Sequence, residues 1–280
     1  MKIGIIGSGT MGNGISHSFA LNGFNVLMHD INKEMLIKGL DNIKTNLERM
    51  RKKDIINSEQ ISLTLDNIST TTDLGDMNDR DLVIEAATEN LDIKISIFEK
   101  LDSIVNSNCI LASNTSSISI EKLAASTSRP KKVIGMHFMN PVPVMKLVEV
   151  ITTEETSSKT IETIISTSKS LKKEPVQCLD SPGFISNRIL IPMINEAIYA
   201  LMGGIATVES IDKIMKLGMS HPMGPLALAD LIGLDVCLSI MNVLKDGFEG
   251  DSKYEPCPLL IKMCNEGKLG RKSGEGFYKY

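Results

Sequence analysis

Long apolar runs are absent from this 280-residue chain. Its apolar stretches fall well short of the roughly 18 residues that a membrane span requires. Glycines interrupt the N-terminal apolar run, where a signal peptide would need an unbroken apolar core. We therefore expect a cytoplasmic protein that makes no contact with a membrane.

The chain also lacks a strong excess of charge of either sign. Its 34 acidic and 30 basic residues give a net charge of −4, so no global field recruits nucleic acid or an anionic membrane. The five cysteines show no C-x-x-C spacing, and none of the four histidines has the spacing of metal ligands. These absences indicate neither a disulfide framework nor a metal site, and they favour small molecules as partners.

Short strand-like runs alternate with helical patterns through most of the chain. Examples are "KIGII", "FNVLMHD", "DLVIEAA" and "CILAS", and alternation of this kind is typical of an α/β protein with a doubly wound, mostly parallel sheet. The helical stretches between about residues 33 and 67 exceed an ordinary crossover and predict a helical insertion.

The pattern changes at "DSPGFISNR", after which nearly everything is helical. Ser181 followed by Pro182 resembles a helix N-cap with proline at the first helical position. The sequence thus predicts two domains, an α/β domain over 1–181 and an all-α domain over 182–280.

Three glycines follow the first predicted strand and open the first helix. Gly7, Gly9 and Gly12 form G-x-G-x-x-G, in which they permit a tight turn, close approach of a pyrophosphate, and packing of helix on strand. Asp30 ends the next strand, where a carboxylate accepts from a ribose 2′-hydroxyl and repels a 2′-phosphate. The pattern predicts a Rossmann-type domain that prefers NAD to NADP; the alternative is a glycine-rich turn beside an unrelated aspartate.

Five residues fall at or just beyond the carboxyl ends of predicted strands, which is where open parallel sheets bind ligands. They are Gly7, Asp30, Glu89, Ser116 and His137.

One histidine and one glutamate interrupt the apolar runs of "MHFMNPVPVMKLVEV". His137 can act as a general acid or base, and Glu149 can orient it if the proline-containing connection folds back on itself. Taken singly, a structural histidine and an outward-facing glutamate are the alternatives. His17 lies inside the first helix and His29 lies beside Asp30. For these two histidines, a surface position or a place near the cofactor is a sufficient explanation.

These motifs together resemble the 3-hydroxyacyl-CoA dehydrogenase family over essentially the whole chain. The resemblance rests on "GSGTMGNGI", "DLVIEAATEN", "ILASNTSSISI", "GMHFMNPVPVMKLVEVI", "SPGFISNRIL", "MKLGMSHPMGPLALAD" and "GRKSGEGFYKY". It is closest to the short bacterial members that act on 3-hydroxybutyryl-CoA in butyrate-type metabolism. It implies reversible hydride transfer between NAD and C3 of a short-chain L-3-hydroxyacyl-CoA, as in acetoacetyl-CoA reduction.

The resemblance also implies roles for individual residues. His137 would be the acid/base with Glu149 orienting it, while Ser116 and Asn187 would contact the substrate oxygen; helix capping is the alternative for these last two. The implied cofactor contacts are Asp30, Glu89, Lys94, Ser116, Asn140 and Lys272.

Coenzyme A would contact the helical insertion through Lys53, with Asn46 at a position that is commonly serine in the family; a solvated charged face is the alternative. The family further implies a homodimer formed through the C-terminal helical domain. Two other functions stay open: a two-domain NAD(P) β-hydroxyacid dehydrogenase that uses a catalytic lysine, and a catalytically silent NAD-binding structural protein.

Overall fold

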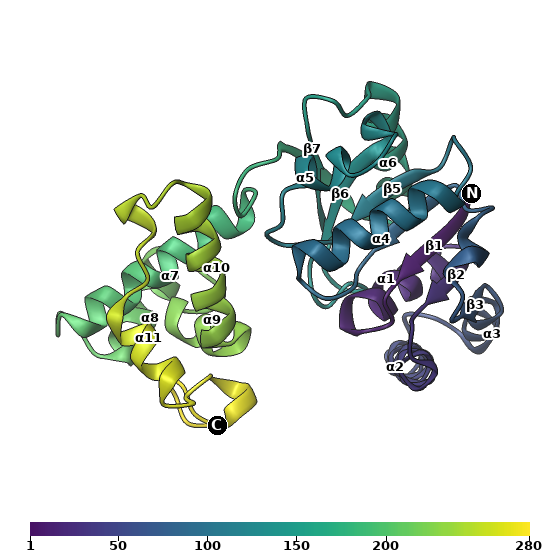
Figure 1. The fold of residues 1–280 in the computed structure, drawn as a ribbon. Coiled ribbons are helices and arrows are strands. Elements are labelled where there is room, and N and C mark those ends of the chain that lie inside the picture. The colour runs from purple at the N-terminus through teal and green to yellow at the C-terminus, as the bar shows by residue number, and fades with distance from the viewer. The chain divides into compact units, whose positions relative to one another are not determined.

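The computed structural model describes residues 1–280, which form two compact units, Met1–Asp180 and Ser181–Tyr280 (Figure 1).

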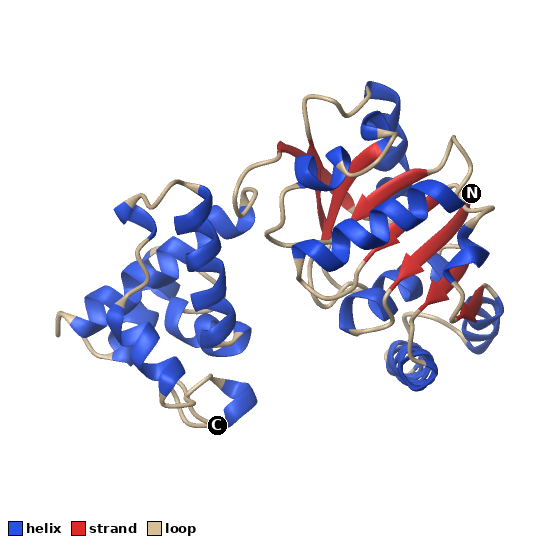
Figure 2. Cartoon of the chain, in the orientation of Figure 1, coloured by secondary structure: helices blue, strands red, loops and turns tan.

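The first unit is built on an eight-stranded sheet flanked by helices (Figure 2), with strand order β3-β2-β1-β4-β5-β6-β7-β8. All neighbouring strands are parallel except β6 and β7, which are antiparallel, so the predicted mostly parallel sheet is confirmed. The central strands are buried runs rich in isoleucine, valine and leucine, as expected for strands covered on both faces. The strands are β1 (Lys2–Ile6), β2 (Asn25–His29), β3 (Ile68–Thr71), β4 (Leu82–Glu85), β5 (Ile110–Ser113), β6 (Val133–Phe138), β7 (Leu147–Thr152) and β8 (Glu174–Leu179).

Six α-helices connect these strands. Two of them, α2 and α3, form the region of the predicted insertion and pack around Ile43, Leu47 and Ile56 as a small core of their own. The helices of this unit are α1 (Thr10–Leu21), α2 (Lys33–Arg51), α3 (Ser58–Asp66), α4 (Leu91–Ile104), α5 (Ile120–Ala125) and α6 (Ser158–Ser170), with short 3-10 turns at Leu74–Met77 and Pro130–Lys132.

The second unit is helical and has a separate apolar core. Its helices are α7 (Ser186–Met202), α8 (Val208–Gly218), α9 (Pro225–Ile232), α10 (Leu234–Gly247) and α11 (Pro258–Asn265), with 3-10 turns at Ser252–Tyr254 and Arg271–Ser273. No single helix is long and apolar enough to cross a membrane. Helices α9 and α10 reach that length and apolar composition only when they are taken together, and the chain bends by 96° between them.

The predicted start of the second unit's first helix is wrong. Ser181 and Pro182 lie in a turn, and α7 begins at Ser186. Gly183 and Phe184 have φ values of 72° and 51°, which a right-handed helix cannot accommodate. The turn therefore delays the helix by more than one full turn of chain.

Candidate active site

The glycine turn between β1 and α1 has the form that dinucleotide binding requires. Gly7 has φ +97°, and a Cβ there would lie 2.7 Å from the carbonyl oxygen of Ala86. A Cβ on Gly12 would lie 1.8 Å from the carbonyl oxygen of Gly7, so this glycine lets helix and turn touch. A Cβ on Gly9 would meet no protein atom within 4 Å, so its side of the turn opens on space that a ligand can enter. Gly9 is also the N-cap of α1 and supplies no side-chain cap, which suits an anion at that helix N-terminus.

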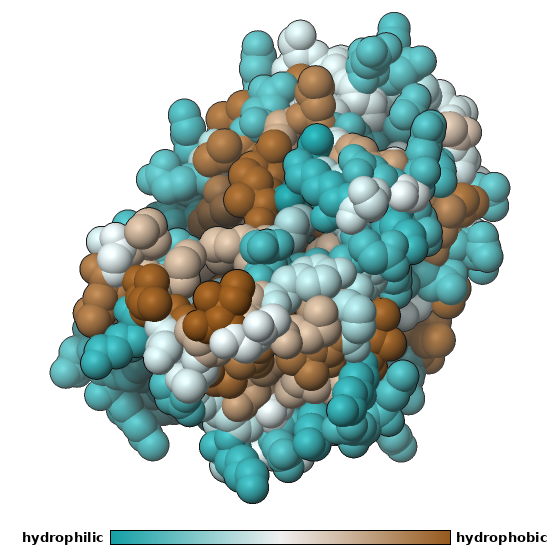
Figure 3. Space-filling model, turned by 90° about the vertical axis from the view of Figure 1, so that its left-hand side faces the viewer, coloured by the Kyte–Doolittle hydropathy of each residue, from teal (hydrophilic) through white to brown (hydrophobic).

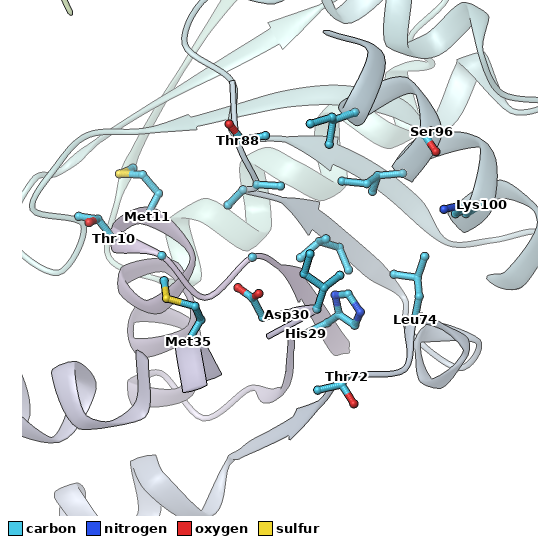
Figure 4. Close-up of a pocket in the computed structure, with 18 of the residues that line it drawn as sticks. Thr10, Met11, His29, Asp30, Met35, Thr72, Leu74, Thr88, Ser96 and Lys100 are labelled. Carbon is cyan, nitrogen blue, oxygen red and sulfur yellow. The ribbon is translucent and has the colours of Figure 1, made fainter. Parts of the chain in front are cut away.

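A cavity of about 1030 Å³ opens beside this turn (Figure 4), a size that accommodates a dinucleotide segment. Of the predicted cofactor residues, it brings together Gly7, Gly9 and Asp30. Its further wall is formed by Leu74 and by residues of α4, among them Ser96 and Lys100, seen opposite Asp30 in Figure 4.

Asp30 is held as a carboxylate at the end of β2. Its Oδ2 accepts hydrogen bonds from Ser8 N (2.9 Å) and Ser8 Oγ (2.7 Å), and its Oδ1 accepts from Asn32 N (3.1 Å). Partial burial alone would raise its pKa, but these hydrogen bonds outweigh burial and lower the pKa below its usual value. Asp30 therefore presents a fixed negative charge to the cavity, which suits a ribose hydroxyl and opposes a phosphate. The residues present fit NAD.

His29 and His17 differ from each other in placement. His29 is buried and lines the same cavity, in line with a place near the cofactor. His17 is completely buried in α1 and does not line the cavity, so the expectation of a surface or cofactor-adjacent position is wrong for it.

A buried ion pair lies at the carboxyl end of β4. Lys94 Nζ is 2.6 and 2.8 Å from the two carboxylate oxygens of Glu85, and both side chains are almost completely buried. Glu85 also accepts from Ser113 Oγ at 2.7 Å. Lys94 is not among the residues that line the large cavity, and its contact with the cofactor stays a prediction. Sequence reasoning missed Glu85, although an acid that ends the apolar run "LVIE" was a signal for it.

Glu89 organises the loop that follows β5. Its Oε1 accepts from Thr115 Oγ1 (2.5 Å) and from the backbone nitrogens of Ser116 (3.0 Å) and Ser117 (3.1 Å). Burial would raise the pKa of Glu89, but the charge of Lys94 and these hydrogen bonds lower it overall. Glu89 and Ser116 are therefore in contact, as their shared place at the strand ends suggested.

Capping of α5 does not explain Ser116. The N-cap of α5 is Ser119, whose Oγ accepts from Lys122 N at 3.3 Å. The alternative of a helix-cap role for Ser116 is therefore wrong.

His137 and Glu149 meet across the antiparallel pair of strands. They are register partners in β6 and β7, so their side chains leave the same face of the sheet. His137 Nδ1 lies 2.7 Å from Glu149 Oε2, and the two residues are 8% and 4% exposed. A carboxylate accepts from Nδ1–H, which leaves Nε2 as the ring nitrogen that can accept a proton from a substrate.

The connection between β6 and β7 lines a second, smaller cavity of about 260 Å³. Asn140 of this connection and Asn46 of α2 both line it, so the structure brings a predicted cofactor residue and a predicted coenzyme A residue to one cavity. Arg49 lines it too and donates to Asn46 Oδ1 at 3.3 Å. Lys53 lies two residues beyond α2, is exposed, and does not line this cavity.

Two predicted residues belong to the helical unit. Asn187 is the second residue of α7, in its first turn. Lys272 forms an ion pair with Asp235, at 2.5 Å from Oδ1, within the same unit. Their contacts with substrate and cofactor stay predictions.

Comparison with known proteins accounts for both units. The chain matches the NAD-binding domain model of 3-hydroxyacyl-CoA dehydrogenase over residues 2–181 and the C-terminal domain model over residues 183–280. The chain belongs to the 3-hydroxyacyl-CoA dehydrogenase family. As a family member with the NAD-binding domain, it is an NAD-dependent oxidoreductase.

Relatives match over the full length. A probable 3-hydroxybutyryl-CoA dehydrogenase of Deinococcus radiodurans is 54% identical over 280 residues, covering 100% of both chains. The 3-hydroxybutyryl-CoA dehydrogenase of Clostridioides difficile is 51% identical, covering 100% of this chain and 99% of its own. Among solved structures, (S)-3-hydroxybutyryl-CoA dehydrogenase of Ralstonia eutropha superposes with a TM-score of 0.97 at 50% identity, covering 100% of this chain and 98% of that one.

Proposed function

We propose that this protein is an NAD-dependent dehydrogenase of short-chain L-3-hydroxyacyl-CoA, and that it interconverts 3-hydroxybutyryl-CoA and acetoacetyl-CoA. The observation that carries the proposal is the 2.7 Å contact between His137 Nδ1 and Glu149 Oε2. The similarity to relatives named for 3-hydroxybutyryl-CoA supports the choice of substrate.

The imidazole of His137 moves the proton. When the C3 hydroxyl is oxidised, Nε2 takes its proton, and in the reverse direction the imidazolium returns it. Glu149 holds the ring in the tautomer that leaves Nε2 able to accept, and it stabilises the imidazolium once formed. NAD, when bound, supplies the hydride acceptor for oxidation and the donor for reduction.

Ser116 and Asn187 are proposed to bond the C3 oxygen as its charge changes. The role of Ser116 is supported by the fixed shape of its loop, because Glu89 accepts hydrogen bonds from the backbone amides of Ser116 and Ser117. Gly7, Gly9, Gly12 and Asp30 are proposed to hold the cofactor, together with Glu89, Lys94, Asn140 and Lys272.

Coenzyme A is proposed to lie along α2, with Asn46 and Lys53 as contacts. The cavity that Asn46 shares with Arg49 supports this placement, because a guanidinium there suits a phosphate.

A homodimer through the helical unit and a cytoplasmic location complete the proposal. Several large apolar side chains of the helical unit are exposed, and part of this apolar surface is visible in Figure 3. Covering it against a second copy would remove that surface from water. The exposed set includes Ile189, Ile205, Ile214, Leu217 and Met219.

The test follows NADH absorbance with acetoacetyl-CoA. We expect oxidation by the wild type and, for His137→Gln, loss of nearly all turnover with NADH binding nearly intact, because glutamine cannot carry the proton. A wild type that leaves NADH unoxidised at high enzyme concentration refutes the enzyme proposal, and a His137→Gln variant with wild-type turnover refutes the role of His137. Turnover of free 3-hydroxybutyrate in place of its CoA ester would favour the β-hydroxyacid type.

A further inference from the structure

Lys173 is a buried cation that the proposed mechanism does not use. It immediately precedes β8 and is 6% exposed. Its Nζ donates to the carbonyl oxygens of Val142 (2.5 Å) and Met145 (2.7 Å), which lie 31 and 28 residues away in sequence. Burial lowers its pKa. An ammonium taken out of water in this way is tolerated because strong charge-assisted hydrogen bonds replace its hydration.

Both carbonyl oxygens belong to the connection between β6 and β7. Within it, the carbonyl oxygen of Pro141 accepts from Val144 N (2.9 Å) and Met145 N (3.0 Å), so the connection is a tight turn. Asn140 lies in this turn, and the two strands that it joins carry His137 and Glu149. A contact that fixes the turn therefore also fixes the positions of Asn140, His137 and Glu149 relative to one another.

The helix of the glycine turn supports the connection from another direction. Val142 is 2% exposed, and a Cβ built on Gly14 of α1 would lie 3.0 Å from its Cβ and Cγ2. The connection is thus held between α1 on one side and the Lys173 ammonium on the other. Its residues Asn140 and Val142 line the small cavity that Asn46 of α2 also lines.

His17 lies near enough to Lys173 to feel its charge, and the fold keeps His17 itself uncharged. It lies on α1, is completely buried, and feels the charge of Lys173. Burial and that charge lower the pKa of His17 to about 4, so it is neutral near pH 7. The ammonium therefore meets no second positive charge from α1.

We propose that Lys173 is a positioning residue of the active site, whose ammonium holds the β6–β7 connection in the shape that places Asn140 and the His137–Glu149 pair. The proposal rests on the proposed dehydrogenase function. Small displacements of positioned groups lower catalysis steeply, so loss of the ammonium should lower kcat/KM roughly ten- to hundredfold.

The test compares Lys173→Met with a matched control, Arg129→Met. Arg129 is also a largely buried cation that donates to backbone carbonyls, those of Asn106 (2.6 Å) and Asp102 (2.8 Å), and it forms an ion pair with the Asp102 carboxylate. These contacts lie where α4 leads into β5, at the amino ends of the parallel strands, whereas the β6–β7 connection follows the carboxyl end of β6. Rates of NADH oxidation with acetoacetyl-CoA give kcat and both KM values, normalised to folded protein by circular dichroism. Hydrogen exchange reports on the Val144 and Met145 amides.

We expect Lys173→Met to lose kcat/KM as stated and to exchange the Val144 and Met145 amides faster. Arg129→Met should keep the kcat/KM of the wild type per folded molecule, even where its thermal stability falls equally. Lys173→Arg, which keeps the charge and the donors, should recover part of the loss. Unchanged kcat/KM and unchanged exchange in Lys173→Met overturn the proposal, as does an equal loss of kcat/KM in Arg129→Met.

If Lys173→Met does not fold, Gly14→Ala tests the same clamp from the other side. Its new methyl group presses on Val142, while alanine favours the helix that contains it. We expect a similar loss of kcat/KM with Lys173 intact, and wild-type kcat/KM in this variant overturns the proposal. An inactive wild type would refute the dehydrogenase function instead, and the exchange measurement would still decide whether Lys173 holds the connection.

Discussion

His17 is a buried histidine that the fold keeps uncharged. It is completely buried, and neither ring nitrogen has a hydrogen-bond partner in the protein. Burial, aided by the charge of Lys173, lowers its pKa from 6.5 to about 4. The folded protein therefore resists a proton that the unfolded chain accepts readily.

The sign and size of the effect on stability follow from these two pKa values. Because the folded pKa lies below the unfolded one, the unfolded state binds more protons as the pH falls from about 6.5 towards 4, and stability is lost across that window. Between pH 7 and pH 4.5 the loss from this one group is about 2 kcal/mol.

The variant His17→Leu isolates this effect. Leucine is of similar size and takes no proton, so we expect the unfolding free energy of the variant, minus that of the wild type, to rise by about 2 kcal/mol from pH 7 to pH 4.5. At pH 7 the variant should be at least as stable, since it removes two unpartnered polar atoms from the interior. Urea unfolding followed by circular dichroism measures both, as the chain has no tryptophan for fluorescence.

Other groups titrate in the same range, which is why the difference is measured. The pKa values of Asp30, Glu89 and Asp102 are lowered in the fold, so these carboxylates also cost stability as the pH falls. They do so equally in wild type and variant. A difference in unfolding free energy that stays constant from pH 7 to pH 4.5 would show that His17 is not held neutral by the fold.

Two further predictions concern the site itself. Glu149→Gln keeps an acceptor for His137 Nδ1 but removes the charge that stabilises the imidazolium, so kcat should fall about a hundredfold or more with little change in KM, and steady-state rates with unchanged kcat would contradict it. Asp30→Ala removes the ribose acceptor, so KM for NADH should rise roughly tenfold and the preference for NADH over NADPH should shrink; an unchanged ratio of kcat/KM for the two cofactors would contradict the assignment.

The fold could be predicted because its signals are local. The apolar strands are short and separated by helical patterns, and Gly7 is needed where φ is +97°. The fold-back of the chain after His137 could also be anticipated, because Asn140 and the prolines after it break the strand and leave a short connection.

Burial of charged side chains could not be predicted in the same way. Lys172 and Lys173 are adjacent and chemically identical, yet the first is exposed and the second is buried. Only the turn at the start of β8, where Lys172 has φ 59°, decides which of them faces the interior. The Lys94–Glu85 pair could not be predicted for a similar reason, since its partners are nine residues apart in sequence and meet only in the folded chain. Backbone turns are equally hard to foresee, as the φ of 51° at Phe184 shows, because nothing in a phenylalanine favours it.

The reversal of direction after β6 is what assembles the site. β7 runs antiparallel to β6, and β8 runs parallel to β7. Both therefore begin on the side of the sheet where the carboxyl ends of β1, β4, β5 and β6 lie. A parallel crossover would instead start β7 at the far edge and would give a different pairing. The reversed direction sets Glu149 opposite His137 and brings Lys173, just before β8, to the same edge as the connection that it binds. It also makes the length of that connection critical, because a shift of one residue in the register would turn Glu149 to the other face of the sheet.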